Sequence, residues 1–172
     1  MSRTGFTIQW GAAPCRAEVL GLRGVEELSK PFRLDLDLAL DGEPDAATLL
    51  GSAARVEGSV GGKTRVWSGV IRRVRRSGLL GDGRLATRVR IGPHLSSLAL
   101  RRVSRVFQNR STVEIVSTLL REHGQLVRSE LVDRVARDVC IQHDETDLAF
   151  VERLLAEEGI ASRLECDADT PR

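Results

Sequence analysis

Residues Val139–Cys166, with the sequence VCIQHDETDLAFVERLLAEEGIASRLEC, combine several local structural signals in one short stretch. They predict a strand, a helix with Asp144 as its N-cap, a glycine stop at Gly159 and a second strand over Ile160–Leu164. An N-cap aspartate accepts hydrogen bonds from amides one turn ahead, and glycine readily adopts the left-handed conformation that ends many helices. The stretch therefore predicts a helix packed on a sheet.

The predicted helix has one apolar face and an acidic first turn. Its apolar residues recur at helical spacing and are Leu148, Val151, Leu154 and Leu155. Glu145 and Asp147 bring negative charge to the positive end of the helix dipole. A calcium loop needs alternating oxygen ligands over about a dozen residues with a glycine at the turn, and residues 144–147 lack that context. We therefore interpret these acids as a helix N-terminus.

The chain before Pro93 has the alternation of β-strands. Apolar and polar residues alternate over residues 32–40, 54–60, 64–76 and 85–91, and glycine turns occur at 61–62 and 81–83. If the alternation runs unbroken through residues 64–76, Val74 lies on the face opposite to Ile71. One short helical turn is expected over Asp45–Leu50. Several antiparallel strands joined by turns favour a barrel or a strongly curled sheet.

After Pro93, helical spacing replaces alternation. Ser111 and Glu114 form a capping-box pattern, and Gly124 ends the helix that follows. A second α/β unit is expected from about Val127 to Cys166. The predicted fold is therefore α+β and β-rich, a curled antiparallel sheet or β-barrel followed by helix-on-sheet elements. We place a β-barrel-like domain at residues 1–104 and an α+β segment at residues 105–172.

The composition favours a folded domain without a strongly charged partner. Hydrophobic residues make up 41% of the 172 residues, while aromatic residues make up only 3%, so the core depends on aliphatic side chains. Lysine and arginine number 26 against 24 acids, a formal charge of +2. This near balance gives no reason to expect nucleic acid or an anionic membrane as a partner.

The cysteines and the N-terminal residues indicate the cellular compartment in which the protein folds. Cys15, Cys140 and Cys166 are odd in number and widely spaced, which excludes a complete disulfide framework and favours folding in a reducing compartment. The first residues lack the apolar core of a signal peptide, and no apolar run approaches the ~20 residues that span a bilayer. We expect folding in the cytoplasm, with any export following a route that needs no cleavable signal.

No group of residues in the sequence has the spacing of a catalytic, cofactor or metal site. Cys140 and His143 are three apart in a predicted strand, so their side chains point to opposite faces. His94 and His123 have no motif partner, and we interpret both as surface or loop residues. Gly61–Thr64 resembles the end of a phosphate loop but is followed by a strand. We therefore expect that the protein is not an enzyme.

Arginines form the strongest charged pattern, and three interpretations of it stay open. They lie within Arg72–Arg76 and Arg101–Arg105. A small basic nucleic-acid-binding domain is the alternative function, although aromatic stacking residues and a recognition-helix pattern are lacking. Solvated strand edges that resist edge-to-edge pairing are the favoured interpretation. Salt bridges across a subunit interface are the third.

Five pieces of the sequence resemble one family. They are Glu27–Leu36, Val66–Val70, Ile91–Leu95, Arg105–Val116 and Val139–Cys166. In this order they are similar to the N-terminal hub region of the VgrG tip proteins of type VI secretion, which are related to the tail-hub and late-control D proteins of contractile phages. The resemblance implies a structural protein, with residues 105–172 as the start of a second hub domain. VgrG proteins are longer, and Ala161–Arg163 replaces aromatic residues expected there.

The resemblance also implies partners and residue roles. Three copies would form a ring that adapts a tube of hexameric rings to a trimeric spike, with a spike or effector domain following. The outward charges expected at the subunit interface are Arg33, Asp35, Asp37, Arg65, Arg73 and Arg75. The positions that match the family motif are Phe107, Gln108, Glu145, Asp147, Phe150 and Gly159, which we interpret as fold-defining.

Overall fold

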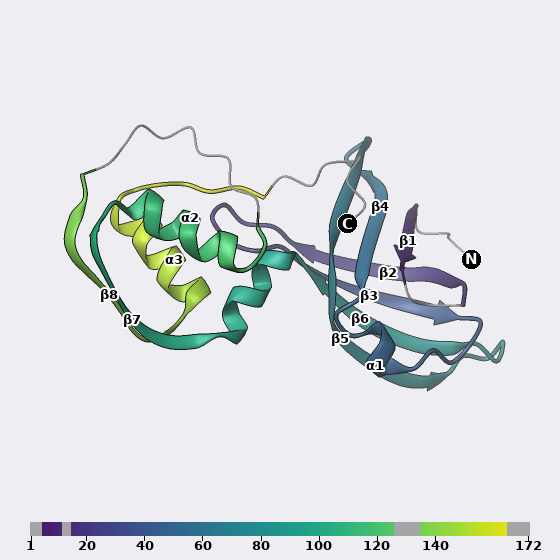
Figure 1. Cartoon of the computed structure of the whole chain (residues 1–172). Helices are drawn as coiled ribbons and strands as arrows, with labels where there is room; N and C mark the ends of the chain where they lie inside the picture. Colours follow the sequence, from purple (N-terminus) through teal and green to yellow (C-terminus); the bar gives the residue numbers. More distant parts are fainter. Residues whose placement is uncertain (1–4, 12–14, 126–134, 165–172) are drawn as a thin grey trace. The chain divides into compact units, whose positions relative to one another are not determined.

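The computed structural model describes residues 5–11, 15–125 and 135–164, which form two compact units (Figure 1). The first contains the described residues up to Glu27, Phe32–Pro93 and Leu164, and the second contains Leu28–Pro31 and the described part of His94–Arg163. Residues 94–104, which the sequence prediction assigned to the first domain, lie in the second unit. Val127, the expected start of the second α/β unit, and Cys166 lie outside the described residues.

The first unit is a single antiparallel sheet. Its strands are β1 (Phe6–Trp10), β2 (Ala17–Val25), β3 (Arg33–Leu40), β4 (Ala53–Val60), β5 (Lys63–Leu79) and β6 (Leu85–Gly92). They pair in the order β1-β4-β5-β6-β3-β2. The sheet curls until its two end strands, β1 and β2, come close to each other (Figure 1). This architecture confirms the predicted β-rich α+β fold with a curled antiparallel sheet.

Apolar side chains fill the inside of this curl. The alternation in β3 places Leu34, Leu36 and Leu38 in the core, and Leu49 of the short helix α1 (Ala46–Leu49) joins them. The predicted helical turn over Asp45–Leu50 is therefore confirmed. The predicted turn at 61–62 is confirmed as well, because both glycines have positive φ and join β4 to β5.

The prediction for Val74 was wrong. Ile71 pairs with Ile91 and Val74 pairs with Val89, so a bulge between Ile71 and Arg73 inserts one residue into β5. A bulge shifts the side-chain alternation by one position. Val74 therefore lies on the same face as Ile71 and packs against the core, where an unbroken strand would have placed it outside.

The second unit is a two-stranded ribbon with helices on one face (Figure 1). Its elements are the 3-10 helix η1 (His94–Leu100), β7 (Arg102–Arg110), α2 (Thr112–Glu122), β8 (Arg137–Thr146) and α3 (Asp147–Glu157). Leu98, Phe107, Leu119, Phe150 and Leu154 form its core. No helix in the described part of the chain is long and apolar enough to cross a membrane.

The helix-end signals in this unit are mostly confirmed. The side chain of Ser111 accepts a hydrogen bond from the Glu114 amide, and the Glu114 carboxylate accepts one from the Ser111 amide. Gly124 and Gly159 follow the ends of α2 and α3 with φ of 68° and 64°. The amide of Ile160 also donates to the Leu155 carbonyl, which closes the end of α3.

Two predictions for residues Val139–Cys166 were wrong. The N-cap of α3 is Thr146, whose hydroxyl accepts from the Ala149 amide, whereas Asp144 belongs to β8 with a φ of 43°. Residues 160–164 are not a strand. Residues 161–164 are exposed, so no apolar face holds them against a sheet, and Ser162 instead exchanges hydrogen bonds with Ser29.

Candidate functional site

The outer face of the curled sheet carries rows of charged side chains. Strands β5, β6, β3 and β2 are neighbours in that order, and their register aligns outward residues into rows. One row contains Arg73, Arg90, Asp35 and Arg23. We use the name charged sheet face for Arg23, Arg33, Asp35, Asp37, Arg73, Arg75, Arg88 and Arg90.

The two aspartates of the charged sheet face are held by arginines of the neighbouring strand. Asp35 lies 2.8 Å from the Nε of Arg90, and Asp37 lies 2.6 Å from the Nε of Arg88. The hydrogen bonds that Arg88 and Arg90 donate to these carboxylates raise the pKa of both guanidinium groups. The Asp37–Arg88 pair is exposed and the Asp35–Arg90 pair is only partly buried, so each contributes little to stability. Their main effect is to fix the orientation of the side chains.

The charged sheet face retains an excess of positive charge. Six arginines against two aspartates leave a formal charge of +4. Arg73 faces Arg90 and Arg75 faces Arg88 across the β5–β6 ladder, an arrangement that is destabilising within a sheet. Among the described residues, neither Arg73 nor Arg75 forms an ion pair, and both are exposed. These two side chains are therefore available to an acidic partner.

The structure groups five of the six predicted interface residues. Arg33, Asp35, Asp37, Arg73 and Arg75 belong to the charged sheet face. Arg65 does not, because it forms a 2.8 Å ion pair with Glu26 and its guanidinium lies over the ring of Trp67, a core residue. The sequence reasoning missed Arg23, Arg88 and Arg90, because their position beside Asp35 and Asp37 depends on strand order.

A buried carboxylate organises the second unit. The side chain of Asp147, at the start of α3, is 0% exposed and approaches residues from three other segments. The Nε2 of His123 lies 2.9 Å from it, the Nε2 of Gln142 lies 2.8 Å from it, and Arg101 and Arg105 also bind it. Glu122 of α2 binds both arginines in turn. We call these six residues the Asp147 network.

The network decides the charge state of its acids. Burial by itself raises the pKa of the Asp147 carboxyl, but hydrogen bonds from Gln142, His123 and Arg101 outweigh it and hold the pKa below its usual value. Burial likewise opposes ionisation of Glu122, and hydrogen bonds from Arg101 and Arg105 lower its pKa overall. Both side chains are therefore carboxylates at neutral pH, matched by two arginines.

His123 lies in the turn after α2, so it is a loop residue but not a surface residue. Its side chain is only 13% exposed because it lies against Asp147. A signal for this site was present in the sequence. Cys140 is a small apolar residue of a type often buried, and Gln142 lies two residues further along the same strand, on the same face. A buried glutamine needs a polar partner, which Asp147 supplies.

The arginines of the candidate nucleic-acid patch have acidic partners in the second unit. Arg101 and Arg105 bind the Asp147 network, and Arg102 pairs with Asp144 at 3.0 Å. In the first unit, Arg76 binds Glu43 and the Pro44 carbonyl. These four arginines are engaged within the fold, which weakens the phosphate-binding interpretation for them, whereas Arg73 and Arg75 of the same patch are exposed.

Within the described ranges, no group of three or more histidine, cysteine or acidic side chains has the geometry of a metal site. Cys140 is buried in the core of the second unit, and His143 is exposed. The two side chains do not converge, as the strand geometry predicted.

The family-motif residues lie throughout the second unit. Phe107 of β7 and Phe150 of α3 stack in the core with ring centroids 5.7 Å apart. Glu145 binds Arg153 at 2.6 Å, which ties the end of β8 to α3. Gln108 is exposed on β7, and Gly159 provides the left-handed end of α3.

Comparisons with known proteins agree with this architecture. Residues 25–171 match the phage tail baseplate hub (GPD) family. The type VI secretion system spike proteins VgrG4b and VgrG5 of Pseudomonas aeruginosa are 34% and 37% identical over 92% and 83% of this chain. The match covers 20% and 18% of those proteins, so this chain spans about a fifth of their length.

Two solved structures have a similar fold. The c3393 protein of E. coli, described as a component of the type VI secretion system with structural similarity to the T4 bacteriophage tail proteins gp27 and gp5, superposes with a TM-score of 0.84 at 27% identity. The match covers 94% of this chain and 46% of that one. The 43 kDa tail protein of prophage MuSo2 from Shewanella oneidensis has a TM-score of 0.66 at 15% identity, over 91% of this chain and 50% of its own.

Proposed function

We propose that three copies of this chain, which belongs to the phage tail baseplate hub (GPD) family, form a ring that joins a hexameric tube to a trimeric spike. Membership of this family, together with the VgrG spike relatives, supports a structural component of the type VI secretion tip. The ring, the tube contact and a spike or effector domain beyond it are the proposed part. In this role the protein folds in the cytoplasm and leaves as part of the machine.

The charged sheet face is the observation that carries the ring proposal. A cyclic trimer needs a heterologous contact, in which one surface of each copy meets a different surface of its neighbour. Arg73 and Arg75 are exposed and oppose other arginines across the sheet. An acidic surface of a neighbouring subunit would relieve that repulsion. Complementary charge of this kind sets the orientation and speed of assembly more than the final affinity.

The curled sheet suits a mechanical role. Neighbouring strands from β1 to β2 are joined by continuous ladders, so a load on one strand is shared by many hydrogen bonds. The Asp147 network and the Phe107–Phe150 stack connect the strands and helices of the second unit. We propose that the six family-motif residues act by stabilising the fold and that the protein works as a scaffold without catalysis.

Light scattering on the purified chain, alone and mixed with the hexameric tube protein, tests this function. We expect the mass of a trimer, and a larger complex when the tube protein is added. The variant Arg73→Glu/Arg75→Glu should weaken the trimer about tenfold at low salt, with a smaller effect at high salt. Arg16→Glu/Lys63→Glu is the matched control, because it makes the same charge change at exposed positions outside the charged sheet face.

Three results would count against the proposal. A chain that stays monomeric at all concentrations and does not associate with the tube protein would exclude the ring. Equal weakening by both double variants would show that net charge matters and that the charged sheet face has no special part. Retained trimerisation with unchanged salt dependence in the Arg73→Glu/Arg75→Glu variant would exclude this face as the contact.

A further inference from the structure

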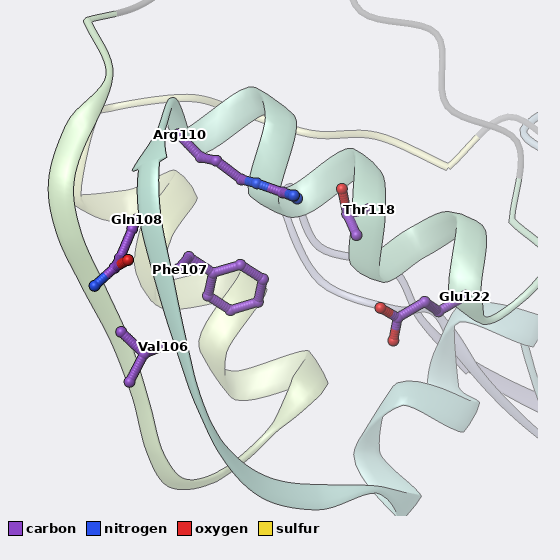
Figure 2. A pocket seen from close by; sticks show the side chains of 6 residues that line it. All are labelled: Val106, Phe107, Gln108, Arg110, Thr118 and Glu122. Carbon is purple, nitrogen blue, oxygen red and sulfur yellow. The ribbon is translucent and has the colours of Figure 1, made fainter.

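An open groove of about 580 Å³ lies beside β7 in the second unit (Figure 2). It is lined by Val106, Phe107, Gln108, Arg110, Thr118 and Glu122. Figure 2 shows the Phe107 ring pointing toward the helices, while Val106 and Gln108 point away from them. Arg110, Thr118 and Glu122 lie along the α2 side. The groove therefore follows one edge of a strand, with a helix as its opposite wall.

That edge of β7 is unpaired. The ribbon contains only β7 and β8, so the other edge of β7 has no neighbouring strand among the described residues. Within the same residues, no side chain or backbone group from outside the ribbon hydrogen-bonds to the backbone of β7. On β8, by contrast, Arg153 donates to the Ile141 carbonyl at 3.1 Å. An uncovered edge is a template for pairing with another extended segment.

The side chains around the edge describe what such a segment would contain. Val106 and Ile141 are paired across the ribbon on the face away from the helices, and they are 60% and 52% exposed. Alternate apolar side chains of an added strand would extend this surface. Arg110 at the end of β7 forms no ion pair among the described residues, although its charge lowers the pKa of the Glu114 carboxyl. Glu122 is already bound by Arg101 and Arg105. Among the charged residues that line the groove, Arg110 is therefore the one without an ion pair.

A second copy of the chain fits this edge poorly. If two copies of β7 paired in antiparallel fashion around Val106, Arg102 of each copy would lie opposite Arg110 of the other. The pair would therefore contain two contacts between arginines. Like charges directly opposite each other in a sheet are destabilising. An extended segment with an acidic residue at its end would instead place a carboxylate opposite Arg110.

We propose that the free edge of β7 binds an extended segment of a partner protein by strand addition, with apolar residues at alternate positions and an acidic residue opposite Arg110. The ribbon then becomes a three-stranded sheet, and backbone hydrogen bonds to β7 supply most of the affinity. This contact is separate from the charged sheet face and does not require the ring.

Peptide binding followed by fluorescence anisotropy tests the proposal on the whole chain. The probe is the labelled peptide Glu-Thr-Val-Thr-Val-Thr-Glu, with N- and C-terminal caps, because a glutamate opposite Arg110 then places both valines on the same face as Val106. Only alternate N–H groups of a bound peptide point toward β7. We therefore methylate either the odd or the even backbone nitrogens of the peptide, and we expect at least one of these two patterns to weaken binding about tenfold or more. Replacing both glutamates of the peptide by lysine should weaken binding up to about fivefold, the range of a cross-strand charge pair.

A charge exchange identifies the site. Arg110→Glu should reverse the preference, so that the lysine-ended peptide binds more tightly than the glutamate-ended one, whereas Arg16→Glu in the first unit should leave the preference unchanged. Amide hydrogen exchange on the unaltered chain adds a readout that needs no variant. Alternate amides of β7 should become protected when the glutamate-ended peptide is added.

Three outcomes would overturn the inference. The first is no binding of the glutamate-ended peptide at millimolar concentration. The second is binding that neither N-methylation pattern affects, which would indicate side-chain contact without strand addition. The third is protection of the β7 edge through self-association of the chain in the absence of peptide, which would make a second copy the occupant.

Discussion

Replacing Asp147 by asparagine keeps the size of the side chain but removes the only buried carboxylate of the described residues. The asparagine amide would also present hydrogen-bond donors to arginines that donate themselves. His123 and Gln142, which are largely or fully buried, would have to find new partners. We expect the second unit to lose stability while the first unit keeps it.

The structure sets the size of this loss. Removing one partner from a buried ion pair costs about 3–5 kcal/mol, chiefly because the remaining charge is buried without compensation. Arg101 and Arg105 are 37% and 26% exposed, and both keep Glu122, so the remaining charges are only partly desolvated. We therefore expect the lower end of the range, about 3 kcal/mol. Asp144→Asn is the matched control, because Asp144 is exposed and its pair with Arg102 is worth about 0–1 kcal/mol.

Urea unfolding distinguishes the two units in one experiment. Both tryptophans, Trp10 and Trp67, lie in the first unit, whereas the long helices α2 and α3 lie in the second. Tryptophan fluorescence therefore follows the first unit, and circular dichroism at 222 nm follows mainly the second. Asp147→Asn should shift the dichroism transition to lower urea and leave the fluorescence transition in place. A shift no larger than that of Asp144→Asn would refute the reasoning.

The pH dependence gives a second check on the same residue. Because the folded-state pKa of Asp147 is lowered, its contribution is fully present above the unfolded pKa of about 3.9 and is lost as the pH falls through the folded value. The stability difference between the unaltered chain and Asp147→Asn should therefore be constant near neutral pH and shrink in acid. Glu122 also has a lowered pKa and titrates in the same direction, so both chains lose some stability in acid. A difference that stays constant down to pH 2 would contradict the assignment.

Other substitutions test separate parts of the fold. Phe150→Ala removes a fully buried ring that stacks on Phe107 and should cost about 3–5 kcal/mol by the dichroism assay; a loss below about 1 kcal/mol would show that the core is not organised around this stack. Ser111→Ala removes the capping box of α2 and should cost about 1 kcal/mol in the same assay, whereas Thr118→Ala, away from the cap, should cost less. Gly159→Ala should cost about 1 kcal/mol from the positive φ, because no atom lies near enough to clash with an added methyl group; an unchanged midpoint would mean that the chain end rearranges freely.

Local signals predicted the elements well where short-range contacts decide them. The capping box at Ser111 and the glycine ends at Gly124 and Gly159 involve residues within one or two helical turns, and all three are confirmed. The N-cap of α3 shows where such reasoning stops. Asp144 and Thr146 are both good caps, and the choice depends on β8, which continues to Thr146 because that residue pairs with Arg102 of β7.

Features that depend on strand order were not visible in the sequence. The bulge at Ile71–Arg73 has no glycine or proline to mark it, yet it reverses the side on which Val74 lies. The charged sheet face likewise needs β3 beside β6 and β6 beside β5, although these strands are far apart or separated by turns along the chain. The Asp147 network joins residues up to 46 positions apart, and only the buried position of Gln142 indicated it.

Native mass spectrometry of the chain mixed with the hexameric tube protein tests the central claim, that this hub-family chain assembles as a ring on the tube. We predict a complex of three copies of the chain on one tube hexamer, and a smaller fraction of this complex at the same concentration on charge reversal at Arg73 and Arg75. A single copy per hexamer, or no complex at all, would contradict it.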